Sequence, residues 1–170
     1  LAAGSGSRMK SSTKKQFMEL KGKPILWYSL FAFEEYGVDQ IILVTGKEDI
    51  EYCKKEIVER YGFEKVTDIV AGGKERYESV YNGLGKVTGD IVLIHDGARP
   101  LISQDIIERC IEGAIKDGAC VAGMPVKDTI KIINDNKIVI DTLNRNCLWI
   151  TQTPQSFMYE LVKTAYDKMQ

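Results

Sequence analysis

The sequence predicts an α/β protein with a Rossmann-like, mainly parallel sheet and helices on both faces. Short runs of β-branched and apolar residues alternate with longer segments whose apolar residues recur at helical spacing. The short runs lack polar alternation, which is typical of strands that are buried on both faces of a parallel sheet. One β-rich stretch interrupts the alternation, and it predicts a hairpin that projects from the sheet.

The buried strands are expected at residues 40–45, 66–71, 90–95 and 119–124. Helices are expected over residues 48–61, 76–84 and 103–116. Ser103 is suited to cap the last of these helices, and Gly118 lies where a helix commonly ends.

The hairpin is predicted from residues 129–133 and 137–140, which flank the turn Asn134-Asp135-Asn136. Residues 1–3 resemble the end of a strand, and residues 159–170 stop inside a helical pattern. We therefore expect a fragment of one domain, incomplete at both ends, that spans residues 1–170 with an arm at about 126–150.

The overall composition excludes several classes of protein. A net charge of −1 argues against a nucleic-acid binder, and no apolar run is long enough to span a bilayer. We therefore expect neither nucleic acid nor membrane as a partner. One histidine and four cysteines without a C-x-x-C pair do not make a zinc site, so no metal ligand is assigned. Free cysteines indicate a reducing compartment, and we expect a cytoplasmic location.

Positive charge is concentrated in residues 1–24, where a glycine-rich stretch, Gly4-Ser5-Gly6-Ser7-Arg8, follows the first strand end. Glycines allow backbone N–H groups to surround a phosphate closely. Met9 replaces the third glycine of the dinucleotide fingerprint, and the P-loop pattern is absent. The remaining interpretation is a triphosphate site in which Lys14 and Lys15 assist Arg8. A tight turn with solvated basic residues is the alternative.

Two more clusters follow strands, where open α/β sheets bind ligands. Gly72-Gly73, with Ser79 nearby, is suited to contact the edge of a base, although a flexible turn is the alternative. In His95-Asp96-Gly97-Ala98-Arg99-Pro100, Asp96 and Arg99 are suited to sugar hydroxyls, a metal or phosphate. The alternative is an Asp96–Arg99 ion pair that stiffens the loop. His95 is interpreted as a hydrogen-bonded structural residue.

The last cluster comprises Asp128-Thr129, Arg145 and residues 151–155. Hydroxyl groups and one arginine suit a small ligand, such as the acceptor of a transferred group, that carries hydroxyls and a phosphate. Turn and hairpin chemistry is the alternative interpretation.

Taken together, these stretches resemble the 2-C-methyl-D-erythritol 4-phosphate cytidylyltransferase family. The resemblance rests on LAAGSGSRM, KKQF, GGKERYESVYNGL, HDGARP, VKDTIK and LNRNCLWITQTPQSF, which follow one another in order across nearly the whole chain. It implies a nucleotidyltransferase that transfers CMP from CTP to 2-C-methyl-D-erythritol 4-phosphate for isoprenoid precursor synthesis and releases pyrophosphate. Mg²⁺ would be held mainly through the CTP phosphates.

The resemblance also assigns roles to individual residues. The catalytic cations would be Arg8 and Lys15. The nucleotide would contact Ala2, Ala3, Gly4, Gly6, Gly73, Ser79 and Asp96. The acceptor would contact Arg99, Thr129, Arg145 and Thr153. The family's arm crosses to a second subunit, which implies a homodimer with shared sites, and a further acceptor-side Lys and Thr of the family fall beyond Gln170.

Three alternatives remain open from the sequence. A cytidylyltransferase for another polyol phosphate, such as ribitol 5-phosphate, would share the CTP loops. A non-catalytic nucleotide-binding module would need base contacts more than positive charge at the α-phosphate. An NAD-type Rossmann domain is disfavoured by Met9.

Overall fold

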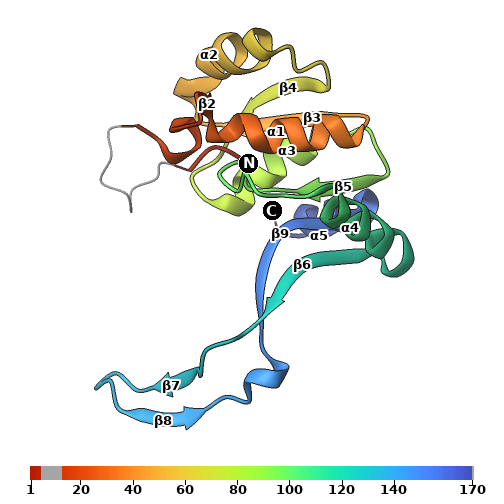
Figure 1. Ribbon diagram of the computed structural model, residues 1–170. Coiled ribbons are helices and arrows are strands. Elements are labelled where there is room, and N and C mark those ends of the chain that lie inside the picture. Colours follow the sequence, from red (N-terminus) through yellow and green to blue (C-terminus); the bar gives the residue numbers. More distant parts are fainter. Residues whose placement is uncertain (5–12, 170) are drawn as a thin grey trace.

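The computed structural model describes residues 1–4 and 13–169, and it confirms the α/β class (Figure 1). The strands are β1 (Glu19–Leu20), β2 (Lys23–Pro24), β3 (Ile41–Thr45), β4 (Val66–Ala71), β5 (Ile91–Ile94), β6 (Ala119–Pro125), β7 (Lys131–Ile133), β8 (Val139–Thr142) and β9 (Trp149–Met158). The helices are α1 (Ile25–Tyr36), α2 (Ile50–Tyr52), α3 (Arg76–Leu84), α4 (Gln104–Asp117) and α5 (Tyr159–Asp167). A π-helical segment, η4 (Cys53–Glu59), continues α2, and short 3₁₀ turns are η2 (Lys15–Phe17), η3 (Lys47–Asp49) and η5 (Arg145–Cys147).

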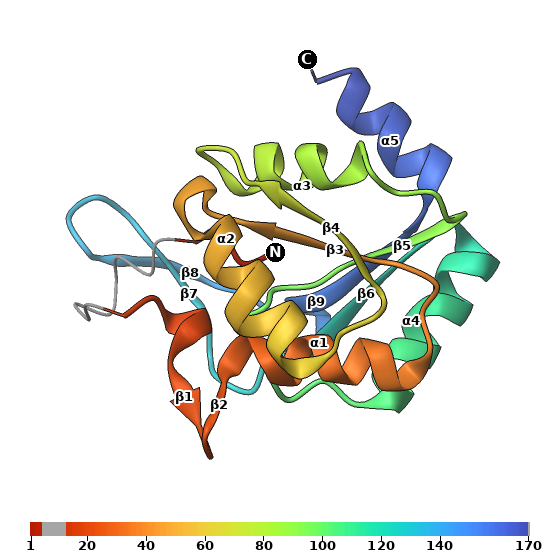
Figure 2. The same ribbon diagram turned by 90° about the horizontal axis from the view of Figure 1, so that it is seen from above.

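Helices cover the strands on two sides. Figure 2 shows α3 and α5 on one side of the strands and α1 and α4 on the other. Helix α4 begins and ends as the sequence predicts. The Ser103 hydroxyl accepts a hydrogen bond from the Ile106 N–H, and Gly118 takes a left-handed conformation with φ of 82°.

Strand pairing differs from the expected mainly parallel sheet. β3 and β4 pair in parallel, and Ala2 forms a parallel bridge to Thr45. β9 lies between β5 and β6 and is antiparallel to both. Among the named strands in the described part of the chain, β3–β4 is thus the one parallel pair.

Sequence reasoning did not predict β9, because its polar residues and Pro154 resemble a turn. Proline cannot donate to a strand ladder and is rarely found in a central strand. Here the ladder to β6 is interrupted: Val121 pairs with Gln155 and the next pair joins Gly123 to Thr151. Pro154 lies within that irregularity, so its missing N–H removes no ladder hydrogen bond.

Helix α1 was also not predicted from the sequence. Its first residues, ILWYSLFAF, are largely apolar, so they lack the polar face that marks an amphipathic helix. Gly37, at φ of 85°, ends the helix in a left-handed cap.

Two buried clusters fix the strands that carry the candidate site. One joins α1, β3 and η4 through Ala2, Leu26, Leu30, Leu43, Cys53, Ile57 and Phe63. The other joins α3, β5 and α5 through Val80, Leu84, Ile94 and Val162. No helix within residues 1–4 and 13–169 has both the length and the apolar character required to cross a bilayer.

The segment between β6 and β9 stands apart from the rest of the protein (Figure 1). Within it, β7 and β8 pair antiparallel, and Lys131 lies opposite Thr142. The turn is closed by Asn134, whose side-chain oxygen accepts from the Ile138 N–H at 2.9 Å. We call this segment, residues 126–148, the hairpin arm.

Candidate functional site

A cleft of about 330 Å³ lies at the edge where β3, β4 and the segment at Leu1–Ala2 end. The cleft is lined by Leu1, Ala2, Ala3, Gly4, Gln16, Gly73, Lys74, Glu75, Arg76, Ser79, Asp96 and Ala98. Three stretches that the sequence analysis singled out separately therefore meet in one place. This edge is where ligands bind in open α/β sheets.

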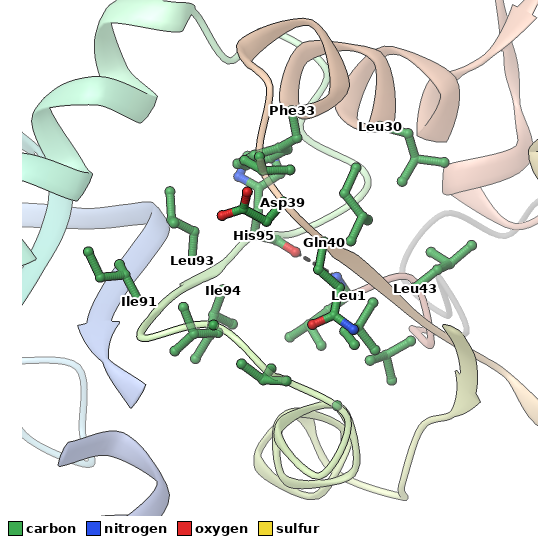
Figure 3. A pocket seen from close by; sticks show the side chains of 18 of the residues that line it. Leu1, Leu30, Phe33, Asp39, Gln40, Leu43, Ile91, Leu93, Ile94 and His95 are labelled. Atoms are coloured by element: carbon green, nitrogen blue, oxygen red, sulfur yellow. Dashed lines mark hydrogen bonds between the residues drawn. The ribbon is translucent and has the colours of Figure 1, made fainter. Parts of the chain in front are cut away.

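The backbone of Leu1 and Ala2 connects two of these stretches. The Ala2 N–H donates to the Val44 carbonyl of β3 at 2.6 Å. On the other side, the Leu1 amino group donates to the His95 carbonyl at 2.6 Å, and the Gly97 N–H donates to the Leu1 carbonyl at 2.7 Å (Figure 3). The start of the glycine-rich stretch is thereby fixed against both β3 and the loop after β5.

Gln16 is a cleft residue that sequence reasoning missed. Its side chain is buried, and its amide nitrogen donates to the carbonyls of Ala2 at 2.7 Å and Gly4 at 3.1 Å. A buried polar side chain must be hydrogen-bonded, and here the partners are backbone groups of the first glycine stretch. The signal in the sequence was the KKQF stretch, which we interpreted only through its lysines.

The second glycine pair packs directly on the first stretch. A Cβ atom added at Gly72 would lie 2.4 Å from the Cβ of Ala3, so no larger residue fits without a shift. The Ser79 hydroxyl is committed to its own loop: it donates to the Glu75 carbonyl at 3.2 Å and accepts from the Gly73 N–H at 3.1 Å. In this structure Ser79 therefore holds Gly73 in place.

The Asp96 carboxylate is shared by two guanidinium groups. One oxygen lies 3.2 Å from Arg76 and the other 3.1 Å from Arg99. Burial by itself raises the pKa of Asp96, but the charge and hydrogen bonds of Arg76 and Arg99 outweigh it, so that this pKa lies below its usual value. Arg76, which sequence reasoning did not assign, lines the cleft, and Arg99 brings a second positive charge beside it.

The Asp96 loop also joins β9. The Asp96 N–H donates to the Thr153 hydroxyl at 3.3 Å, and the Arg99 side chain donates to Gln152. Arg99 and Thr153, both predicted to contact the acceptor, therefore lie beside Asp96, although neither lines the cleft itself.

His95 is hydrogen-bonded, as the structural interpretation predicts. Its ring lies 3.1 Å from both the Arg99 carbonyl and the Thr153 hydroxyl, and 8% of the residue is exposed. Burial lowers the pKa of His95 to about 4. The ring is therefore neutral at pH 7.

The predicted cations have different surroundings. The Lys14 ammonium lies 2.5 Å from both Glu48 and Asp49, so its charge is already balanced. Lys15 is exposed at the start of η2, and no ion pair to it occurs within the described residues. Arg8 and Gly6 lie outside the described residues.

The two remaining acceptor residues are not brought into this cleft. Thr129 lies between β6 and β7, and Arg145 begins η5, so both belong to the hairpin arm. One guanidinium nitrogen of Arg145 donates to the Lys127 carbonyl at 3.2 Å. The arm lies away from the cleft edge of β3 and β4 in Figure 1.

A second cavity, of about 700 Å³, has a different character (Figure 3). It lies between β3 and β5, under α1 and α3, and its lining is mainly aliphatic. β3 pairs with β4, and β5 pairs with β9, so the other edges of β3 and β5 face each other across the cavity. In the described residues, hydrogen bonds connect these two edges only near Leu1 and Ala2. Its charged side chains are Asp39 and Asp90, and its described lining contains no lysine or arginine that would balance a phosphate.

Comparison with solved structures shows what kind of protein this architecture belongs to. A 4-diphosphocytidyl-2C-methyl-D-erythritol synthase from Anaerococcus prevotii is 34% identical, with a TM-score of 0.83 over 99% of this chain and 71% of that one. A bifunctional IspDF from Campylobacter jejuni is 27% identical, with a TM-score of 0.80 over 98% of this chain and 42% of that one. The chain is thus a nucleotidyltransferase of the α/β class.

Sequence comparison identifies the family. The sequence model of 2-C-methyl-D-erythritol 4-phosphate cytidylyltransferase (IspD) matches residues 1–170. Proteins of that name from Alkaliphilus oremlandii and Lachnoclostridium phytofermentans are 53% and 51% identical, over 100% and 99% of this chain and 73% of each of those proteins. The chain belongs to the 2-C-methyl-D-erythritol 4-phosphate cytidylyltransferase family.

The neutral His95 makes stability depend on pH. Its folded pKa of about 4 lies below the usual 6.5, so the unfolded chain binds the proton first as pH falls. We expect the free energy of unfolding to decrease by about 3 kcal/mol between pH 6.5 and pH 4 through this residue. Urea unfolding of the protein and of His95→Asn across that range measures the effect. Parallel pH curves for the two proteins would contradict it.

Proposed function

We propose that this protein transfers CMP from CTP to 2-C-methyl-D-erythritol 4-phosphate and releases pyrophosphate. The family match over residues 1–170 carries the proposal. The cleft supports it, because Ala2, Ala3 and Gly4 meet Gly73 and Asp96 at the ligand-binding edge of the sheet. In the proposal these residues, with Gly6 and Ser79, contact the nucleotide.

In the proposed reaction, an oxygen of the acceptor phosphate attacks the α-phosphorus of CTP, in line with the departing pyrophosphate. Such a transfer depends on positioning and countercharge more than on an acid or a base. Lys15 and Arg8 supply that charge. Lys15 is suited to it, because no carboxylate in the described residues neutralises it, in contrast to Lys14.

The cleft fits Mg²⁺ held mainly by phosphate oxygens. Its described carboxylates are Glu75 and Asp96, and each oxygen of Asp96 already faces a guanidinium group. No group of three or more metal-ligating side chains gathers elsewhere in residues 1–4 and 13–169. When bound with the nucleotide, Mg²⁺ supplies further countercharge for the triphosphate.

The free thiols at Cys53 and Cys110 support a reducing, cytoplasmic setting.

The substrates are tested by following pyrophosphate release. We expect release with CTP, Mg²⁺ and 2-C-methyl-D-erythritol 4-phosphate, and little with ATP, GTP or UTP. Ribitol 5-phosphate in place of the acceptor tests the nearest alternative. CTP binding without release for any acceptor would instead identify a non-catalytic nucleotide-binding module.

The role of Lys15 is tested by Lys15→Ala. Loss of a cation that acts mainly in the transition state is expected to lower kcat on the order of 10²–10³-fold, with a small change in the KM for CTP. Lys55→Ala is a matched control, because Lys55 is exposed and lies 4.0 Å from Glu51 in a surface pair. A Lys15→Ala enzyme with normal kcat would exclude this role.

We also propose that the hairpin arm forms a homodimer in which Thr129 and Arg145 contact the acceptor in the partner's cleft. The arm exposes the apolar side chains of Ile130, Ile132, Ile133, Ile138, Val139 and Ile140, and the adjoining start of β9 exposes Trp149 and Ile150. Many exposed apolar side chains on one short segment are typical of an interface. The separation of the arm from its own cleft supports a shared site (Figure 1).

The dimer is tested by replacing Ile138 and Ile140 with glutamate, which puts charge on this surface. These side chains are 60% and 62% exposed, so the fold of one subunit should tolerate the change. We expect sedimentation to change from dimer to monomer, with loss of transferase activity. Ile115→Glu, at a 63% exposed position on α4, is the control that should remain dimeric.

Finally, we propose a single Rossmann-like domain in which β4, β3, β5, β9 and β6 form one mainly parallel central sheet with the hairpin arm attached. The support is the aliphatic cavity between the facing edges of β3 and β5, which is open to one more extended segment beside the Ala2–Thr45 bridge.

This arrangement is tested by joining six alternating Val and Ile residues to Leu1. Burial of several apolar side chains should raise Tm on the order of 10 °C. A Gly/Ser segment of equal length is the control. Equal Tm values for the two extensions would contradict a strand position in the cavity.

A further inference from the structure

His95 connects the loop after β5 to β9 through both nitrogens of its ring. Nε2 lies 3.1 Å from the Arg99 carbonyl oxygen, and Nδ1 lies 3.1 Å from the Thr153 hydroxyl. The ring packs edge-on against Phe33, with ring centroids 5.2 Å apart. His95 is therefore held between two groups that belong to the predicted acceptor side of the site.

The partners determine which nitrogen carries the proton. A carbonyl oxygen only accepts, so Nε2 must be protonated to bond to Arg99. A neutral imidazole then leaves Nδ1 as an acceptor, and the Thr153 hydroxyl must donate to it. The geometry thus fixes both the tautomer of His95 and the direction of the Thr153 hydroxyl.

The Thr153 hydroxyl can form only a limited number of hydrogen bonds with a ligand. A hydroxyl has one hydrogen and two lone pairs. The hydrogen is used by His95, and one lone pair accepts from the Asp96 N–H at 3.3 Å. One lone pair remains, so Thr153 can accept a hydrogen bond from a ligand but cannot donate one.

We propose that His95 is a positioning residue that makes Thr153 an obligate hydrogen-bond acceptor, and that Thr153 thereby binds a hydroxyl group of the substrate and not its phosphate. The inference rests on the proposed function, because it assigns one contact of the polyol phosphate acceptor. Phosphate oxygens at neutral pH accept hydrogen bonds and find no donor at Thr153. The nearby Arg76 and Arg99 guanidinium groups, with no such limit, are suited to the phosphates.

The tautomer is measured by ¹⁵N NMR of the imidazole ring. The protein contains one histidine, so its ring signals need no assignment. At pH 7 we expect a protonated Nε2 and a hydrogen-bonded, unprotonated Nδ1. Thr153→Val should shift the Nδ1 signal and leave Nε2 nearly unchanged. A protonated Nδ1, or a charged ring, overturns the inference. This measurement needs no enzymatic activity.

The effect on the substrate is measured with a double-mutant cycle. His95→Gln can keep the donor to the Arg99 carbonyl but removes the acceptor that orients Thr153. We expect Thr153→Val to raise the acceptor KM about tenfold in the wild-type background and only about threefold in His95→Gln, with the KM for CTP nearly constant. Equal effects of Thr153→Val in the two backgrounds overturn the role of His95.

Acceptor analogues that each lack one hydroxyl identify the bound group. For the analogue that lacks the hydroxyl bound by Thr153, Thr153→Val should no longer change the KM. Thr153→Ser should have the wild-type KM for every analogue. Thr164→Val, at an exposed position on α5, is the control for loss of a threonine hydroxyl. If Thr153→Val acts equally on every analogue, the hydroxyl contact is wrong. Absence of turnover with any acceptor would instead reject the proposed function.

Discussion

The backbone hydrogen bonds of Leu1 and Ala2 are the constraint on which the candidate site depends. They reach β3 through Val44 and the loop after β5 through His95 and Gly97. These bonds fix the start of the glycine-rich stretch relative to the Gly72-Gly73 pair and the Asp96 loop. Backbone bonds suit this task, because they fix distances between chain segments whatever side chains the site uses.

Charge beside the cleft is organised around one half-buried acid, Asp96. Asp96 holds Arg76 and Arg99 in place, and each guanidinium keeps N–H groups that the carboxylate does not use. An ion pair of this kind adds little stability when it is partly exposed. Its contribution is to hold two forked hydrogen-bond donors in one region, as the proposed binding of a substrate phosphate requires.

Local sequence patterns predicted part of the fold well. β4 and α3 have the predicted bounds, because a β-branched run and a helical period are local signals. The position of β9 was not predictable from local signals: it depends on a ladder interruption at Pro154 that only the partner strand reveals. Helix α1 was missed because both of its faces are apolar near its start.

For the site, the sequence predicted the loops and overlooked the residues that hold them. Gly73 and Asp96 were found through motif and position, and they do line one cleft. Gln16 was missed because a single amide has no periodic or motif signal; its role follows from two carbonyls that are distant in sequence. Thr129 and Arg145 belong to the arm, which lies away from this cleft, so their role in binding the acceptor stays a prediction.

Gln16 has one more consequence, for the backbone of Ala2 and Gly4. By donating to the carbonyls of Ala2 and Gly4, its amide fixes the backbone at the start of the glycine-rich stretch. The neighbouring Lys14 pairs with Glu48 and Asp49 by charge, which dissolved salt weakens. A hydrogen bond from an uncharged amide depends little on ionic strength, so Gln16 should hold Ala2 and Gly4 in brine as in dilute buffer.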